Sequence, residues 1–229
     1  QMKRISIDPI TRLEGHGKIE IFLDDAGEVA NAYFQVPELR GFEKFCEGRL
    51  VEDLPQITER ICGVCPEAHH MASVKAVDDV FHVDPPPTAK KLRELMYSAF
   101  YVADHTTHFY ILSGPDFVMG PDADPAVRNI LGVIAKVPEV GMEVIKAREM
   151  GHEIIEMVAG RKIHPCGALT GGMSHGLNEE ERKRIEDMAK SLVEFAKLTI
   201  KVFDDVVLAN KEYVDLILND SYIHRTYYM

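Results

Sequence analysis

The spacing of apolar residues changes near Pro37, and this change constrains the fold more than any other feature of the sequence. Before it, apolar and polar residues alternate over residues 18–23 and again over residues 30–36, with the turn-forming sequence DDAG between the two runs. Alternation with a period of two indicates β-strands, and such a turn predicts a hairpin. Ile5 and Ile7 are expected to lie in a further strand. We therefore predict a small antiparallel β region at the N-terminus.

Beyond Pro37 the apolar residues recur at helical spacing. Over residues 88–113 they occupy several faces of the predicted helix, which indicates a long helix that is buried. Asp124 and Pro125 are expected to open another helix, because proline is favoured in a first helical turn. Pro138 should break that helix, because proline interrupts a helix interior.

Two more helices are expected after this break. The first should run to Gly160, a residue type that commonly ends helices. Asn178 and Glu181 have the spacing of a capping box, which predicts a long helix over residues 179–208. The predicted fold class is therefore α+β, with a small N-terminal antiparallel β region followed by a bundle of long α-helices.

The domain organisation follows from the same pattern. With 229 residues, of which 46% are hydrophobic, the chain can bury one good core. We predict a single domain over residues 1–229, mainly β over residues 1–37 and mainly helical over residues 38–229. The aromatic run at residues 221–229 has no polar tail after it, so we expect a chain that was cut there rather than one that ends there.

Charge and composition limit which partners and which cellular compartment can be expected for this chain. The formal net charge of −11 argues against nucleic acid and anionic membranes as partners, since both favour an excess of Lys and Arg. No apolar run reaches the ~18–20 residues of a membrane span, and no signal peptide is visible. Four cysteines are too few for a disulfide framework in a chain of this length. We therefore expect a cytoplasmic protein without a transmembrane segment.

The strongest chemical signal is the sequence RICGVCPEAH, which begins at Arg60. Cys62 and Cys65 are separated by two residues, so both thiolates can bind one metal ion. Pro66 suits the first turn of a helix, which would place Cys65 at the positive N-terminal end, where a thiol pKa is lowered and the metal-binding thiolate is favoured. His69 would lie one turn along, as a hydrogen-bond donor to a bound sulfur or as a ligand.

The spacing of the two cysteines alone leaves other interpretations open. The pair could be half of a structural zinc site that is completed by His69, or by His164 and Cys166. It could be a thiol–disulfide redox pair, although the βαβ context for that is missing. It could also be two unbonded cysteines of the core.

A resemblance to a known family changes this balance. The pattern at residues 60–69 resembles the N-terminal metal-binding signature of nickel–iron hydrogenase large subunits. Further segments resemble the same family in the same order, namely DPITRLEGHG at residues 8–17, RGFE at residues 40–43, and GRKIHP at residues 160–165 followed by two glycines at 171–172. The chain is thus similar to the N-terminal half of such a subunit. Its details are most similar to the cytoplasmic, viologen-reducing branch of methanogens and related anaerobes, which does not reduce deazaflavin.

The resemblance implies a role for each motif residue. Cys62 would be a terminal nickel ligand and Cys65 would bridge nickel and iron. His69 would donate to the bridging sulfur, and Arg60 would support the same loop. Glu14 would take the proton that leaves the site. Soft thiolates do suit nickel and iron, and a carboxylate can relay a proton outward.

Two carboxylates also have plainer interpretations. Without the family argument, Glu14 could form a salt bridge with Arg12 or Arg4. The resemblance implies that Glu43 helps to hold a magnesium ion, whereas otherwise it would be a solvated helix residue that pairs with Lys44. The implied cofactors are a nickel–iron centre with cyanide and carbon monoxide on iron, the magnesium ion, and iron–sulfur clusters in a partner subunit.

The sequence departs from the family in one respect. The family has a second pair of cysteines near its C-terminus, and nothing after Cys166 matches it. The expected partners are therefore an iron–sulfur small subunit, a chain or segment with the C-terminal half of the site, and an electron-acceptor protein of flavin, ferredoxin or disulfide-reductase type. This chain alone is expected to be inactive, and apolar surface is expected where the other half packs.

Three functions compete. The first is a share in a nickel–iron hydrogenase that reversibly splits dihydrogen into protons and electrons. The second is a non-catalytic scaffold, hydrogenase-like or related to the large subunit of respiratory complex I, and the intact pair Cys62 and Cys65 argues against it. The third is an unrelated zinc module, which would need His164 or Cys166 close to Cys62. In the first case the loop with both cysteines is expected to lie deep, where helices meet.

Overall fold

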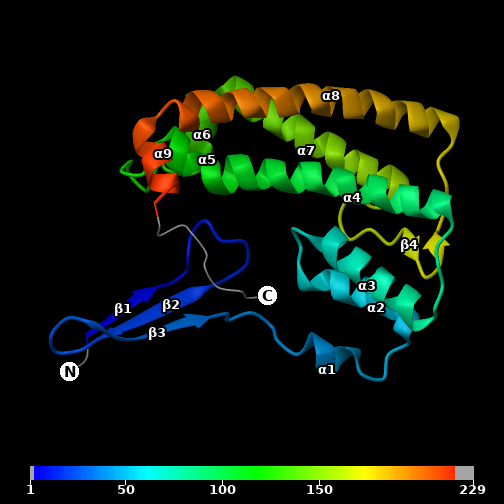
Figure 1. The fold of residues 1–229 in the computed structure, drawn as a ribbon, viewed down its shortest axis with the longest axis horizontal. Helices are drawn as coiled ribbons and strands as arrows, with labels where there is room; N and C mark the ends of the chain where they lie inside the picture. The colour runs from blue at the N-terminus through cyan, green and yellow to red at the C-terminus, as the bar shows by residue number, and fades with distance from the viewer. Residues whose placement is uncertain (1–2, 220–229) are drawn as a thin grey trace. The chain divides into compact units, whose positions relative to one another are not determined.

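The computed structural model describes residues 3–219 (Figure 1). The aromatic run at residues 221–229 lies outside this range. By their internal contacts the described residues form two compact units, one with residues 3–100 and 155–176 and the other with residues 101–154 and 177–219. The helices α4 and α7 contribute residues to both units. That the whole chain is one domain stays a prediction.

The first unit begins with a three-stranded antiparallel sheet in the order β1-β2-β3. Its strands are β1 (Lys3–Ile7), β2 (Lys18–Leu23) and β3 (Val29–Gln35). The predicted hairpin and the third strand are therefore confirmed. The turn between β2 and β3 closes on Asp24, whose Oδ1 accepts hydrogen bonds from the backbone N–H groups of Ala26 and Glu28.

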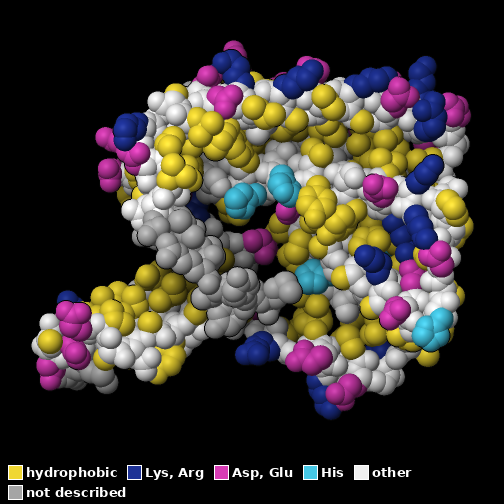
Figure 2. All heavy atoms as spheres, viewed as in Figure 1, with side chains coloured by type: hydrophobic (Ala, Val, Ile, Leu, Met, Phe, Trp, Pro, Cys, Tyr) yellow, Lys and Arg dark blue, Asp and Glu magenta, His cyan; other side chains and the backbone are white. Residues whose placement is uncertain are grey.

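One face of this sheet is apolar. The register places Ile5 opposite Ile21, and Ile7 opposite Ile19, which faces Phe34 on β3. These side chains are partly exposed, and Phe34 is 62% exposed. Figure 2 shows apolar side chains gathered over the strands. The sheet thus exposes apolar surface, and whether the missing half packs against it stays a prediction.

Short helices follow the sheet and lead to the cysteine motif. They are α1 (Phe42–Cys46), η1 (Val51–Asp53), α2 (Leu54–Thr58) and η2 (Glu59–Ile61). Next come α3 (Pro66–Val80) and α4 (Pro87–Thr107), and the small hairpin of β4 (Ala168–Leu169) and β5 (Gly172–Met173) completes the unit. Its core contains Val74, Val77, Ala89, Met96, Ala99, Ile155 and Val158.

A buried ion pair joins α3 and α4 to the β4–β5 hairpin. Arg93 on α4 donates to the Asp78 carboxylate on α3 at 2.5 Å, and to the backbone carbonyls of Leu169 and Gly172 at 2.7 and 3.0 Å. Asp78 in turn accepts from the backbone N–H of Gly171 at 2.6 Å. The pair therefore satisfies the backbone of the β4–β5 hairpin, which contains the two family-like glycines.

The second unit is helical throughout its regular elements. These are the end of α4, η3 (His108–Ser113), α5 (Gly114–Val118), α6 (Ile130–Lys136), most of α7 (Pro138–Ala159), α8 (Glu179–Phe203), η4 (Asp204–Leu208) and α9 (Lys211–Ile217). The predicted long helices are confirmed, with a π-helical last stretch in η3 and η4. The α+β class is confirmed.

Two helix predictions need correction. Asp124 and Pro125 open no helix: the Asp124 side chain accepts the Ala126 N–H in a turn, and α6 begins only after the cap Asn129. This turn can pack closely because residue 132 is a glycine. A Cβ on Gly132 would lie 1.9 Å from a backbone oxygen of the turn. The expectation that residues 88–113 are buried on several faces is wrong as well. One face of α4 is buried, while Tyr101 is 47% exposed.

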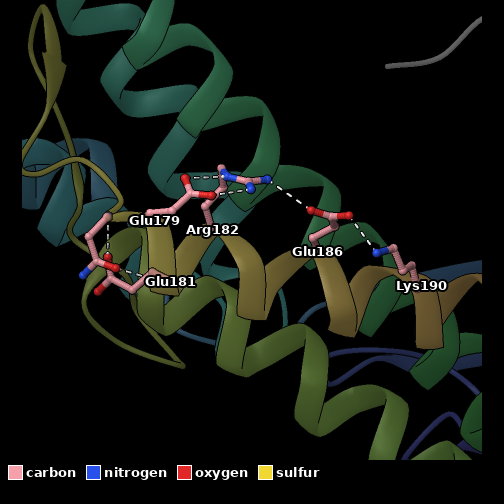
Figure 3. Close-up of polar contacts among 6 residues, drawn as sticks. Glu179, Glu181, Arg182, Glu186 and Lys190 are labelled. Carbon is pink, nitrogen blue, oxygen red and sulfur yellow. Dashed lines mark hydrogen bonds and ion pairs between the residues drawn. The ribbon is translucent and has the colours of Figure 1, made fainter.

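The sequence of α8 accounts for where this helix begins and which of its faces is buried. The predicted capping box is present: the Asn178 side chain accepts the Glu181 N–H, and the Glu181 carboxylate accepts the Asn178 N–H (Figure 3). Exposed ion pairs join Arg182 to Glu179 and Glu186 along its outer face. Its inner face buries Ile185, Leu192 and Phe195. No helix within residues 3–219 has the length and apolar character that crossing a bilayer requires.

Candidate metal centre

The cysteine motif lies between two helical elements of the first unit. The single 3₁₀ turn η2 leads into Cys62, which is extended with φ −136° and ψ 131°. Cys65 is the N-cap of α3, and Pro66 occupies the first turn, as the sequence predicts. The chain therefore turns between the two cysteines and presents both at the start of one helix.

The side chains of this turn converge. One ligand atom each of Cys62, Cys65 and His69 lies within 4.8 Å of the other two. In the described part of the chain they form the one group of three potential metal ligands. The backbone N–H of Cys65 donates to Cys62 Sγ at 3.2 Å, which stabilises negative charge on that sulfur.

Glu14 reaches the same place from the loop between β1 and β2. The Cys62 thiol donates to Glu14 Oε1 across 3.7 Å. The loop closes through a hydrogen bond from the Ile10 N–H to the Gly17 carbonyl at 2.9 Å. Gly17 is closely packed there, since a Cβ would lie 2.7 Å from a methyl carbon of Leu13, and the Leu13 side chain would have to shift to make room for one. The alternative pairing of Glu14 with Arg4 is not what the structure has, since Arg4 pairs with Glu20 at 3.5 Å.

Arg60 contacts a residue that sequence reasoning missed. Its guanidinium donates to the carboxylate of Glu59, which is completely buried. Burial raises the pKa of Glu59, and the cations of Arg60 and Arg161 oppose this shift. His164 lies near Arg60 and the Glu59 backbone, and burial, followed by the Arg60 charge, lowers its pKa.

His70 is the second residue that sequence reasoning missed. It is 1% exposed, with Nδ1 3.7 Å from Glu59 Oε2 and 3.4 Å from the Pro55 carbonyl. Burial is the main cause that lowers its pKa. The sequence offered one signal for both missed residues, which is that each is adjacent to a motif residue. Glu59 directly precedes Arg60, and His70 directly follows His69.

Glu43 lies on α1 and is exposed. Lys44 pairs with Glu47 at 2.5 Å, so the expected pairing of Lys44 with Glu43 is wrong. Within residues 3–219 Glu43 belongs to no group of three potential ligands. The magnesium role of Glu43 stays a prediction.

The form of the zinc interpretation that needs His164 and Cys166 loses those neighbours, whereas the form that needs His69 has its three residues together. Neither His164 nor Cys166 belongs to the cluster of potential ligands around Cys62 in the described chain. Cys46 and Cys166 are half-buried free thiols, in keeping with packing roles.

The expectation of a deep site is wrong for this chain. Cys62 and Cys65 are only half-buried, and between and beside them Val64 is 45% and Ile61 46% exposed. Exposed apolar side chains beside the cysteine turn are surface that another chain or segment could cover.

The donor set tests whether a nickel–iron centre could be held here. Two thiolates on one turn, one of them already accepting an N–H donor, are the soft ligands that nickel and iron favour. A nearby imidazole can orient a bound sulfur. The residues present fit one side of such a centre and leave its other side open.

Comparisons with known proteins agree with this geometry. Residues 40–129 match the family described as nickel-dependent hydrogenase, and residues 4–39 match the family described as HoxL-like. The chain is 51% identical over 222 residues to an iron-sulfur subunit of the F420-non-reducing hydrogenase of Archaeoglobus profundus, covering 96% of this chain and 46% of that protein. It is 45% identical to a vhu subunit of the F420-non-reducing hydrogenase of Methanocaldococcus jannaschii, covering 100% of this chain and 54% of that protein.

Solved structures resemble the fold as well. An NAD+-reducing [NiFe]-hydrogenase in its H2-reduced state superposes with a TM-score of 0.86 at 37% identity, covering 93% of this chain and 48% of that chain. The Ni-Fe-Se hydrogenase from D. vulgaris Hildenborough gives a TM-score of 0.74 at 32% identity, covering 95% of this chain and 46% of that chain. The chain thus spans about half the length of the relatives that it matches.

Proposed function

The chain belongs to the nickel-dependent hydrogenase family, and from this premise we propose that it supplies one half of the active site of an enzyme that interconverts dihydrogen with two protons and two electrons. The observation that carries this proposal is the convergence of Cys62, Cys65 and His69, with Glu14 Oε1 3.7 Å from Cys62 Sγ. These residues are a metal-binding turn with a carboxylate next to one of its sulfurs.

Each residue has a role in this proposal. Cys62 and Cys65 would hold the nickel–iron centre, with cyanide and carbon monoxide on its iron, and when bound it would supply a Lewis-acidic, redox-active site for dihydrogen. His69 donates a hydrogen bond to the Cys65 sulfur, and Arg60 supports the turn. Such groups around a ligand commonly decide how well it binds metal.

Glu14 moves the proton. Heterolytic cleavage of dihydrogen needs a base within reach, and the thiolate of Cys62 can take the first proton. The Glu14 carboxylate lies next to that sulfur and is itself exposed, so it can accept the proton and release it outward. In the reverse direction the same carboxylate delivers the proton.

The remaining parts belong to partners. We propose a chain or segment that carries the second pair of cysteines, an iron–sulfur small subunit that takes the electrons, and an acceptor of flavin, ferredoxin or disulfide-reductase type. Glu43 would help to hold magnesium where the two halves meet. Two relatives of which about half the length is matched here are F420-non-reducing hydrogenase subunits, which supports an enzyme that does not reduce F420. A cytoplasmic location is part of the same proposal.

The test is metal analysis of the native complex, purified without oxygen, with its chains identified by mass spectrometry. We expect about one nickel per copy of this chain, together with a polypeptide that bears a second Cys-x-x-Cys motif. Cys62→Ser and Cys65→Ser should each abolish nickel binding, while Cys46→Ser and Cys166→Ser, the matched controls, should retain it. Zinc in place of nickel, or no metal with both thiols free, would favour the non-catalytic scaffold.

A further inference from the structure

Two buried polar side chains bracket the metal-binding turn. Glu59 begins η2, the turn that leads into Cys62, and is 0% exposed. His70 directly follows His69 on α3, the helix that leads away from Cys65, and is 1% exposed. The two residues thus lie at the entry and the exit of the turn, outside the residues that bind metal in the proposed function.

The two side chains meet across the base of the turn. Glu59 Oε2 lies 3.7 Å from His70 Nδ1, and that oxygen has no hydrogen-bond partner among the described residues. His70 Nδ1 also approaches the Pro55 carbonyl on α2 at 3.4 Å. In Figure 1 α2 and α3 run beside each other at this point. His70 thus links α3 to α2 through the Pro55 carbonyl, and Glu59 of η2 lies against the same imidazole without a hydrogen bond to it.

The cations around Glu59 come from two segments. Arg60 donates directly to its carboxylate, and Arg161 contributes a favourable charge from the loop that follows α7. His164 of the same loop lies beside the Glu59 backbone carbonyl and Arg60. A buried carboxylate destabilises a fold unless partners compensate it. Arg60 and Arg161 therefore supply the positive charge that compensates a carboxylate at this place.

The printed contacts of the turn itself are the Cys65 N–H bond to Cys62 Sγ and the approach of Glu14 to that sulfur, and its middle is open. Val64 is 45% exposed, and a Cβ on Gly63 would meet nothing within 4 Å. Because the middle of the turn packs against little, the residues at its two ends, Glu59 and His70, are placed to influence how the sulfur atoms lie. Replacing a residue that orients a metal ligand without binding the metal itself commonly changes the metal affinity.

We propose that Glu59 is a positioning residue of the metal centre: with His70 it clasps the base of the turn and fixes how Cys62 and Cys65 present their sulfur atoms to one metal ion. This inference rests on the proposed function, because it assumes that these two thiolates bind metal. It assigns to Glu59 a contact with Arg60 and His70, not with the metal or the substrate.

The experiment compares Glu59→Gln with Glu52→Gln in the full chain, purified without metal and without oxygen. Glu52 lies seven residues earlier, is exposed, and receives the same change of charge, so it is the matched control. Each protein is titrated with Co²⁺, whose thiolate charge-transfer absorption reports how many sulfur atoms bind it. Circular dichroism and thermal unfolding establish that each variant is folded.

We expect Co²⁺ to bind Glu59→Gln about 10- to 100-fold more weakly than the unsubstituted chain, with a changed charge-transfer band. Glu52→Gln should bind as the unsubstituted chain does. His70→Gln, which removes the other half of the clasp, should weaken binding as Glu59→Gln does, and it provides the answer if Glu59→Gln fails to fold.

The outcomes separate the two proposals. If the unsubstituted chain shows the two-thiolate spectrum and folded Glu59→Gln and His70→Gln keep its affinity and spectrum, the clasp is overturned while the proposed function stands. If the unsubstituted chain binds Co²⁺ without any thiolate band, the metal-binding premise fails and the clasp fails with it.

Discussion

Glu14 Oε1 lies 3.7 Å from Cys62 Sγ, although 48 residues separate the two along the chain. The contact brings the loop between β1 and β2 to the end of η2 within one compact unit. It gives the cysteine turn a carboxylate base at hydrogen-bond range. Proton transfer by a positioned side chain depends first on such a distance.

Glu14→Gln should therefore separate proton transfer from metal binding. The amide keeps the size of the side chain and cannot accept the proton, so dihydrogen oxidation by the assembled enzyme should fall by about 10²- to 10⁴-fold. Nickel content should stay unchanged, because Glu14 is not a ligand. Hydrogen–deuterium exchange of dihydrogen together with metal analysis measures both. Glu28→Gln, at the exposed hairpin turn, is the control, and equal activity in the two variants would rule out the role of Glu14.

Arg93→Met tests the buried ion pair with Asp78. The substitution leaves a buried carboxylate unpaired and removes the donors to the Leu169 and Gly172 carbonyls. Breaking a buried pair in this way costs about 3–5 kcal/mol in the free energy of unfolding. Urea unfolding followed by circular dichroism gives the value. Lys190→Met on the exposed face of α8 should leave stability unchanged, and a similarly small effect for Arg93→Met would show that the pair contributes little.

Asn178→Ala tests the capping box of α8. The variant loses the side-chain acceptor for the Glu181 N–H. Loss of such a cap typically lowers the free energy of unfolding by about 1 kcal/mol. The same urea measurement applies, with Ser191→Ala in the exposed middle of α8 as the control. If both variants unfold at the same urea concentration, the cap does not limit the stability of α8.

His70→Gln should change how stability depends on pH in the metal-free chain. Burial lowers the pKa of His70 below the ordinary value of 6.5, so the unfolded chain binds this proton at a higher pH than the folded chain. Stability from the neutral imidazole is present above pH 6.5 and is lost as the pH falls from there toward the lowered pKa. His70→Gln should show a smaller loss over this window.

Urea unfolding at several pH values between about 7 and 5 measures this slope, with exposed His105→Gln as the control. Glu59 contributes in the opposite sense, because burial raises its pKa above 4.5 and its contribution to stability falls as the pH rises through the raised pKa. An unchanged slope in His70→Gln would mean that this imidazole titrates alike in the folded and unfolded chains.

Most of the fold was predicted from patterns among residues that are close together in the sequence. The alternation over β2 and β3, the capping box at Asn178 and the stop at Gly160 were all readable, because each depends on residues within a few positions of one another. Cys62, Cys65 and His69 belong to the same class, since one turn and the start of one helix bring them together. The turn at Asp124 was misread because a rule for first turns cannot anticipate the close packing at Gly132.

The sequence by itself thus determined the order and type of the main elements, the cysteine turn, and the family. Only the tertiary structure decided that Glu14 contacts Cys62, that Glu59 and His70 meet beneath the turn, and that Arg93 and Asp78 hold the β4–β5 hairpin. Periodicity and capping are set by backbone geometry over one or two turns. Contacts between residues far apart in the chain, and the burial of a charge, depend on how whole elements pack, and no short stretch of sequence contains that information.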